Sequence, residues 1–256
     1  MSKNIVMYAA VLPLVIPVFL GCMLLEKYRG GWLQPARRTW LLRTAFLSSL
    51  ELATLVAVGY LVRDWWRLPS LFQWDELAAW QGGLCAYLAG SLVFYWWHRL
   101  RHEHDWFWRV FHQVHHSSAR LETLTAFYKH PVEAVGNALL SSVLVYLVFG
   151  LDYTGAAFYT ALTLAAQLLV HVNTRTPRWL GWFFQRPEMH RIHHQPGTEH
   201  LNYCDIPLWD MLFGSYVNPE RFEGQCGFDP AREERLGDML RFVDVHATGS
   251  QAKERS

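Results

Sequence analysis

Apolar residues gather in five stretches separated by shorter polar segments. These stretches cover residues 5–25, 44–62, 84–97, 134–150 and 153–170. A helix of about 20 apolar residues crosses the roughly 30 Å hydrocarbon core of a membrane. The third stretch is shorter and ends in Phe94-Tyr95-Trp96-Trp97, an aromatic cluster typical of a membrane interface. The pattern predicts an all-α, integral-membrane bundle of four to five spans.

The first stretch is interpreted as a retained anchor rather than a cleaved signal peptide. Only Lys3 precedes it as a basic residue, and Pro13 and Pro17 lie inside it. No small-residue cleavage site comes before the next basic segment, whereas a secretory signal normally has one.

Basic residues are distributed unevenly around the stretches. On one predicted side they are Lys27, Arg29, Arg37, Arg38, Arg43, Arg99, Arg101, Arg109, Arg120, Lys129, Arg175, Arg178, Arg186 and Arg191. The other side has only Lys3, Arg63 and Arg67 near the spans. Because Lys and Arg accumulate in cytosolic loops, we expect the N-terminus outside and the C-terminus in the cytosol. Every histidine cluster then lies on the cytosolic side.

Composition narrows the class of partner. The formal net charge of the 256-residue chain is +1, which gives no argument for a nucleic-acid partner. The four cysteines are far apart, so the sequence predicts neither a disulfide framework nor a thiolate zinc site. Cys22 and Cys85 lie in apolar stretches and are expected to be small core residues. Metal ligation is left to nitrogen and oxygen.

Eight of the 13 histidines form three boxes at the edges of apolar stretches. The boxes are His98-x3-His102, His112-x2-His115-His116 and His190-x2-His193-His194. Spacings of three and four place side chains on one face of a helix, so each box is expected to aim its rings at one point. Neutral imidazole is a common ligand for iron, zinc and copper, and eight imidazoles exceed the four ligands of one tetrahedral ion. The boxes therefore predict two metal ions.

Two familiar metalloenzyme patterns are missing. No Glu precedes His98, His112 or His190 by three residues, so the Glu-x-x-His pairs of soluble di-iron bundles are absent. The H-E-x-x-H pattern of zinc proteases is absent as well. His104, two residues after His102, faces away from it on a helix and is expected to be solvated or outside the ligand set.

Other polar residues could complete a metal site. His171 ends the fifth stretch at the depth of His98 and is the first candidate for an additional ligand. Five residues are second-shell candidates or possible ligands: His130, Asn173, His200, Asn202 and Asp210. Asn202 and Asp210 are expected to orient ligand imidazoles, because a ligating histidine commonly donates its other N–H to an oxygen. His246 is expected to be solvated.

Taken together, the boxes and their flanking residues resemble the fatty acid hydroxylase and sterol desaturase superfamily. The motifs that carry the resemblance are Tyr95-Trp96-x-His98-Arg99-x-x-His102, His112-x-x-His115-His116, His130-Pro131-x-Glu133, His171-x-Asn173, Glu188-x-His190-Arg191-x-His193-His194, Asn202-Tyr203 and Leu208-Trp209-Asp210-x-Leu212-Phe213-Gly214. They cover roughly residues 85 to 217. Cys204 stands where the family usually has Gly, and His200 lies near where it often has an acidic residue.

The resemblance implies a helical membrane fold with a cytosolic, histidine-rich helical cap. It implies two iron ions held by the three boxes with His171, and O2 as co-substrate. It also implies two electrons from NAD(P)H, delivered by a cytochrome b5-like or ferredoxin-type donor. The domains expected are residues 1–82 (membrane anchors and outer loop), 83–217 (catalytic) and 218–256 (polar tail, with a short helix over 230–242 and disorder from 248).

We therefore expect a membrane-bound lipid hydroxylase that acts on a fatty acyl, alkyl or sterol-like C–H bond. Specificity is expected to come from the shape of an apolar slot. A desaturase with the same metals is the alternative within this class. A zinc hydrolase would need a Glu base beside the metal, and a metal transporter would place its ligands near mid-membrane. Glu51 is the one acidic residue inside the second stretch, which argues against transport.

Overall fold

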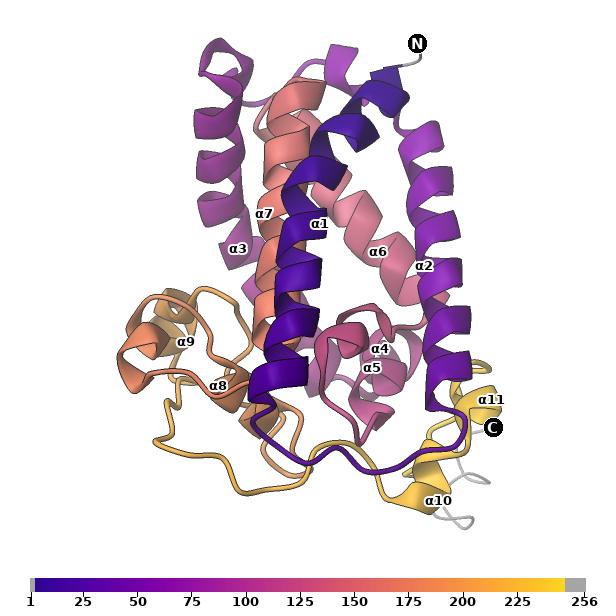
Figure 1. Cartoon of the computed structure of the whole chain (residues 1–256). Helices are drawn as coiled ribbons and strands as arrows, with labels where there is room; N and C mark the ends of the chain where they lie inside the picture. The colour runs from indigo at the N-terminus through magenta and orange to yellow at the C-terminus, as the bar shows by residue number, and fades with distance from the viewer. Residues whose placement is uncertain (1–2, 247–256) are drawn as a thin grey trace.

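The computed structural model describes residues 3–246, and its regular elements over that range are helices (Figure 1). The long ones are α1 (Lys3–Arg29), α2 (Trp40–Leu61), α3 (Ala79–Glu103), α6 (Pro131–Ser142) with its π-helical continuation η5 (Val143–Val148), and α7 (Tyr153–His171). The short ones are η1 (Trp65–Arg67), η2 (Trp74–Glu76), α4 (Asp105–Phe107), η3 (Trp108–His112), α5 (Gln113–Ser117), η4 (Thr123–Phe127), η6 (Arg178–Trp182), α8 (Pro187–His193), α9 (Pro207–Phe213), α10 (Pro230–Glu233) and α11 (Leu236–Met239). The long helices form a bundle, and most of the short ones form a cap at one end of it.

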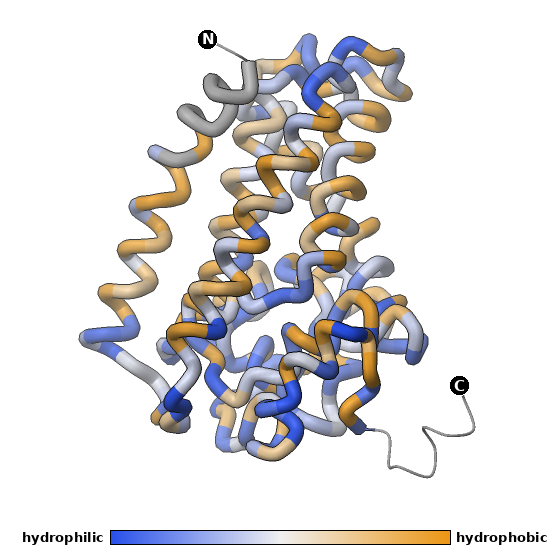
Figure 2. The backbone as a smooth tube through the Cα atoms, turned by 90° about the vertical axis from the view of Figure 1, so that its right-hand side faces the viewer, coloured by the Kyte–Doolittle hydropathy of each residue, from blue (hydrophilic) through white to orange (hydrophobic). Residues whose placement is uncertain are grey.

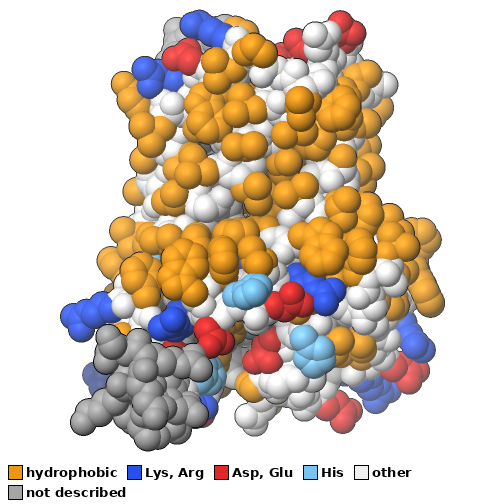
Figure 3. Space-filling view, turned by 180° about the vertical axis from the view of Figure 1, so that it is seen from behind, with side chains coloured by type: hydrophobic (Ala, Val, Ile, Leu, Met, Phe, Trp, Pro, Cys, Tyr) orange, Lys and Arg blue, Asp and Glu red, His pale blue; other side chains and the backbone are white. Residues whose placement is uncertain are grey.

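The bundle has the surface of a membrane protein. Within the described residues, three helical segments are long and apolar enough to cross a membrane: Trp40–Arg67, Pro131–Val148 and Tyr153–His171. Figure 3 shows a broad apolar band across one face of the bundle, with charged side chains toward its two ends, and Figure 2 shows hydrophobic residues along the long helices. The all-α membrane fold is therefore confirmed. The number of spans remains a prediction, since α1 and α3 are not among the three segments.

Helix α7 lies at the centre of the bundle, against both α1 and α3, while α2 packs on α6. The contact between α3 and α7 depends on small residues. A Cβ atom added at Gly83 would lie 2.6 Å from the Cβ of Phe158 and 2.9 Å from the carbonyl oxygen of Gly155. Close approach of this kind is typical of helix pairs in membranes. Cys22 is buried as predicted, but Cys85 is exposed, because its side chain points away from the face that Gly83 presents to α7.

Local signals in the sequence set several of the helix ends. Asp152 begins α7, and its carboxylate accepts hydrogen bonds from the backbone N–H groups of Thr154 and Gly155. Pro131 occupies the first position of α6, where no intrahelical donor is needed. Gly214, at φ 80°, ends α9 in the left-handed conformation that glycine adopts without strain. The signals at Pro131 and Gly214 lie at the cap, whereas α7 begins at the end of the bundle that is away from the cap.

The segment predicted as one helix over residues 230–242 forms two short helices, α10 and α11. Arg235 leaves the helical conformation between them, with ψ at 35°. Met239 is fully buried and belongs to the same core cluster as Trp40 of α2 and Tyr128. The C-terminal segment therefore contributes to the core of the cap. The disorder predicted from residue 248 falls outside the described residues.

Candidate metal centre

Nine histidines meet where the bundle joins the cap. His98 and His102 lie at the end of α3, and His171 at the end of α7, while the others come from η3, α5 and the α8 region. Their potential ligand atoms form two groups, and within each group these atoms lie within 4.8 Å of one another. The five-histidine group contains His98, His102, His112, His116 and His193, and the four-histidine group contains His115, His171, His190 and His194. The groups are adjacent, since the rings of His116 and His194 stack with centroids 4.2 Å apart.

The second and third boxes are each divided between the two groups. His112 and His116 belong to the five-histidine group, whereas His115 belongs to the other. In the third box, His190 and His194 belong to the four-histidine group, and His193 to the five-histidine group. The expectation that each box aims at one point is therefore wrong for these two boxes. Residues i and i+4 stay together, while i+3 lies about 100° of helix rotation away from i+4 and reaches the neighbouring group.

Backbone carbonyls fix the orientation of four rings. The Nδ1–H groups donate to the following oxygens: His98 to Tyr203 O, His115 to Tyr128 O (3.2 Å), His171 to Gln167 O (2.7 Å) and His193 to Leu201 O (2.8 Å). A carbonyl oxygen only accepts, so in each neutral ring the proton is on Nδ1 and Nε2 carries a free lone pair. The Nε2 atoms of these four histidines therefore each have a lone pair available to bind a metal ion.

These lone pairs face one another. The Nε2 atoms of His98 and His193 are 3.0 Å apart, and those of His115 and His171 are 3.3 Å apart. Neither pair has a proton to share, so each contact is repulsive unless a cation lies between the nitrogens. Two imidazole nitrogens bound at about 2.1 Å to one ion lie roughly 3.0 to 3.4 Å apart for octahedral to tetrahedral angles. Both groups therefore fit a metal ion.

Burial supports the same conclusion. His102 Nε2 and both ring nitrogens of His116 are buried without a hydrogen-bond partner among the described residues. Desolvation lowers the pKa of His193 to about 3 and holds the pKa values of His116 and His194 well below the ordinary range. At neutral pH these rings are uncharged, which is the form that binds metal.

Glu133 is a site residue that the sequence analysis assigned no role. Its Oε1 accepts hydrogen bonds from Nδ1 of His112 at 3.0 Å and from Arg101 at 2.6 Å. All three side chains are buried. The carboxylate therefore holds His112 with its Nε2 toward the five-histidine group, and Arg101 balances its charge. The signal was the position of Glu133 in the His130-Pro131-x-Glu133 motif.

Of the remaining histidines, His130 is buried but lies outside both groups, and its Nδ1 accepts from the backbone N–H of Val132 at the start of α6. His200 is exposed and lines a surface hollow of about 360 Å³ together with His102. His104 and His246 are exposed, as expected.

Asn173, Asn202 and Asp210 hydrogen-bond to groups around the site and do not contact a ligand ring directly. Asn173 accepts from Arg191 and from the backbone N–H of Trp32. Asn202 donates to the carbonyl of Met189, and the Asp210 carboxylate accepts from the backbone N–H groups of Tyr203 and Cys204. The expectation of direct contacts from Asn202 and Asp210 to ligand rings is therefore corrected.

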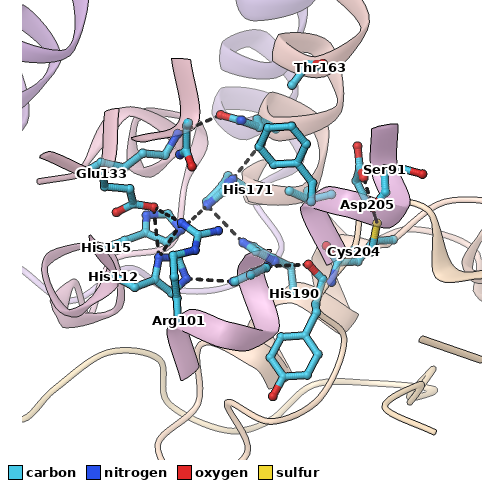
Figure 4. A pocket seen from close by; sticks show the side chains of 18 of the residues that line it. Ser91, Arg101, His112, His115, Glu133, Thr163, His171, His190, Cys204 and Asp205 are labelled. Carbon is cyan, nitrogen blue, oxygen red and sulfur yellow. Dashed lines mark hydrogen bonds and ion pairs between the residues drawn. The ribbon is translucent and has the colours of Figure 1, made fainter. Parts of the chain in front are cut away.

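A cavity of about 130 Å³ separates the histidines from the interior of the bundle. His98 and His112 of the five-histidine group line it, as do His115, His171 and His190 of the other group. Figure 4 shows His171 and His190 between two sets of lining residues, with His112 and His115 on one side and Ser91, Cys204 and Asp205 on the other. A molecule in the cavity would contact both groups at once.

Comparison with known proteins places these features in a family. The model of the fatty acid hydroxylase family matches residues 83–215. An ornithine lipid hydroxylase from Rhizobium tropici is 34% identical over 129 residues, which are 48% of this chain and 38% of that protein. An alkylglycerol monooxygenase from Danio rerio is 28% identical over 216 residues, which are 78% of this chain and 46% of that protein.

A human fatty acid hydroxylase domain-containing protein 2 is 25% identical over 233 residues, 85% of this chain and 65% of its own length. The chain thus spans less than half of the first two relatives. No solved structure matches. Because the family model covers just over half of the sequence, including the three histidine boxes, the chain belongs to the fatty acid hydroxylase family.

Proposed function

We propose that this protein is a membrane-embedded lipid hydroxylase with two iron ions, O2 as its co-substrate and an external source of two electrons. The observation that carries the proposal is the pair of adjacent histidine groups, whose unprotonated Nε2 atoms face one another beside a cavity. The names of the relatives include a lipid hydroxylase and a monooxygenase, which favours hydroxylation over desaturation.

The five-histidine group would hold one iron and the four-histidine group the other. When bound, the two irons would supply the oxidising power to insert one oxygen atom of O2 into a C–H bond, with the second oxygen leaving as water. The donor set is compatible with this use, because imidazole nitrogen is a common ligand for iron.

The protein's own residues position the groups and exclude water. Tyr128 and Gln167 orient His115 and His171 through their carbonyl oxygens, and Glu133 orients His112. The lipid would reach the cavity from the bundle, which restricts the reaction to a segment that enters between α3, α6 and α7.

Three further assignments belong to this proposal. The histidines and the C-terminus lie on the cytosolic side, where a cytochrome b5-like or ferredoxin-type donor passes electrons from NAD(P)H. Residues 83–217 form the catalytic domain. Residues 1–82 anchor and support it, and residues 218–256 form a tail whose first part packs on the cap.

The test is to purify the protein from membranes with its metal and to measure metal content and O2 consumption. We expect close to two irons per chain and O2 uptake only when both reductant and lipid are present, with a hydroxylated lipid as product. Comparing the lipids of cells with and without the expressed chain identifies that product. One stoichiometric zinc with O2-independent turnover would refute the proposal.

A further inference from the structure

The cavity next to the histidines is too small for a whole lipid. Its volume of about 130 Å³ lies below the 300–1,000 Å³ that is typical of sites enclosing a drug-sized ligand. Only a short part of a lipid therefore enters, and the side chains in the cavity contact groups within a few atoms of the reacting carbon. The cavity therefore does not distinguish lipids by the length of their chains.

The cavity wall carries a buried cation, Lys129. This residue precedes α6, and its side chain is 7% exposed. Its Nζ donates to Gln167 Oε1 at 2.8 Å and lies 3.5 Å from Glu51 Oε1 on α2. An ammonium group has three N–H donors, and the described residues engage two of them, one at a long distance. One donor remains for a molecule in the cavity.

Lys129 is also close to the four-histidine group. Gln167, which accepts from Lys129, lies one turn before His171 on α7, and its carbonyl oxygen accepts from His171 Nδ1. A lipid atom that accepts a hydrogen bond from Lys129 is thereby held near the carbon exposed to the metal site. The ammonium group acts as a fixed reference point for the reacting segment.

The charges around the cavity select the kind of acceptor. Lys129 is paired with Glu51, and Arg101 with Glu133, while the carboxylate of Asp205, which also lines the cavity, has no ion-pair partner among the described residues. The protein's own side chains therefore leave no basic group free to neutralise a phosphate or carboxylate, whereas a neutral oxygen would accept from Lys129 without adding a charge. A plain hydrocarbon segment would leave this donor unpaired, which costs binding free energy.

We propose that Lys129 is a specificity-determining residue that binds a neutral oxygen (a hydroxyl, ether or amide oxygen) within a few atoms of the reacting carbon. The protein then favours lipids oxidised next to a polar group over lipids oxidised in mid-chain. This inference rests on the proposed function for its meaning in catalysis, but the binding preference itself can be measured without turnover. It replaces the expectation of a purely apolar slot.

The experiment measures binding to the full-length, metal-loaded protein in lipid nanodiscs. A pyrene-labelled alkyl alcohol is displaced by hexadecane-1,2-diol or by hexadecane, and the ratio of the two displacement constants is compared between variants, so that membrane partitioning cancels. The test variant is Lys129→Met/Glu51→Gln, which removes the donor while keeping the charge balanced. Glu51→Gln alone is its matched background.

We expect Lys129→Met/Glu51→Gln to reduce the preference for the diol by about ten- to a hundredfold, the range for a hydrogen bond from a charged donor. Glu51→Gln alone and the exposed control Lys27→Met should keep the preference. Lys129→Gln/Glu51→Gln, which restores a donor, should recover part of it. An unchanged ratio in Lys129→Met/Glu51→Gln overturns the proposal. So does a wild-type protein with no preference for the diol, a result that does not depend on any variant folding.

The outcome is separable from that of the proposed function. A preference that depends on Lys129 in a protein without O2-dependent turnover would support the recognition site and count against the hydroxylase. O2-dependent turnover, together with a ratio of displacement constants that does not change when Lys129 is replaced, would support the hydroxylase and count against the recognition site.

Discussion

Replacing Glu133 tests how the five-histidine group is held. Glu133 is 1% exposed, and its Oε1 accepts from both Arg101 and His112. Glu133→Gln keeps the size of the side chain but leaves the Arg101 guanidinium without a counter-charge. Breaking a buried ion pair on one side costs about 3–5 kcal/mol. Loss of a residue that orients a ligand lowers metal affinity about 10- to 100-fold. We expect the first effect in Glu133→Gln, and the second only in a variant that removes the oxygen accepting from His112.

Two double variants separate these effects. Arg101→Met/Glu133→Gln removes both charges and keeps an amide oxygen that can accept from His112. Arg101→Met/Glu133→Leu removes both charges and the acceptor. We expect both double variants to recover most of the thermal stability that Glu133→Gln loses, whereas only Arg101→Met/Glu133→Leu should lose iron affinity. The assays are a thermal-unfolding midpoint in detergent and iron retention against a series of chelator concentrations. Glu103→Gln, at an exposed acid on the same helix as Arg101, is the control.

The decisive variant is Arg101→Met/Glu133→Leu. If this protein holds two irons as tightly as the wild type does, then the hydrogen bond from His112 to Glu133 does not orient a ligand, and the carboxylate serves only to neutralise Arg101. If instead Glu133→Gln is as stable as the wild type, the ion pair is not buried in the way that the structure describes.

Three further results are expected. His116→Ala/His193→Ala removes two ligands of the five-histidine group and should leave about one iron per chain. His116→Ala/His190→Ala removes one ligand from each group and should leave almost no iron. Equal iron content in the two variants would contradict the division of the histidines into two groups. Gly83→Leu should lower the thermal-unfolding midpoint through overpacking of about 1–3 kcal/mol, and Gly90→Ala, whose new Cβ would meet its nearest neighbour at 3.6 Å, should not. Because burial holds the pKa of His193 at about 3 in the folded state, against about 6.5 when unfolded, the metal-free protein should lose about 1.4 kcal/mol per pH unit below pH 6.5 through this residue alone. A midpoint that is equal at pH 7.5 and 5.5 would refute this.

The long helices could be predicted because membrane spans are encoded locally. The stretches 44–62 and 153–170 correspond to α2 and α7 within a few residues, since a run of apolar side chains has one favourable environment. The π-helical turns η3 and η5 could not be predicted in this way. A π turn is stabilised by packing around it rather than by its own sequence, and η3 contains His112, the first histidine of the second box.

The candidate ligands could be listed from spacing, but their division could not. The i and i+4 pairs are a property of any helix, so His98 and His102 were rightly expected to act together. Which group receives His115 depends on the place of His171, which is 56 positions away in the chain. That contact is set by the packing of α7, and no local pattern contains it.

The groups that orient the rings are the part of the site that sequence reasoning is least able to find. Asp210 was expected to orient an imidazole through its side-chain oxygens, yet the acceptors for His98 and His193 are the backbone carbonyls of Tyr203 and Leu201. Every residue has a carbonyl, so no residue type marks the one that is used. Asp210 still contributes, because it accepts from the N–H of Tyr203 and so fixes the residue whose carbonyl accepts from His98. A conspicuous polar residue such as Asp210 can therefore act on a ligand ring indirectly, by fixing the residue whose backbone carbonyl accepts from that ring.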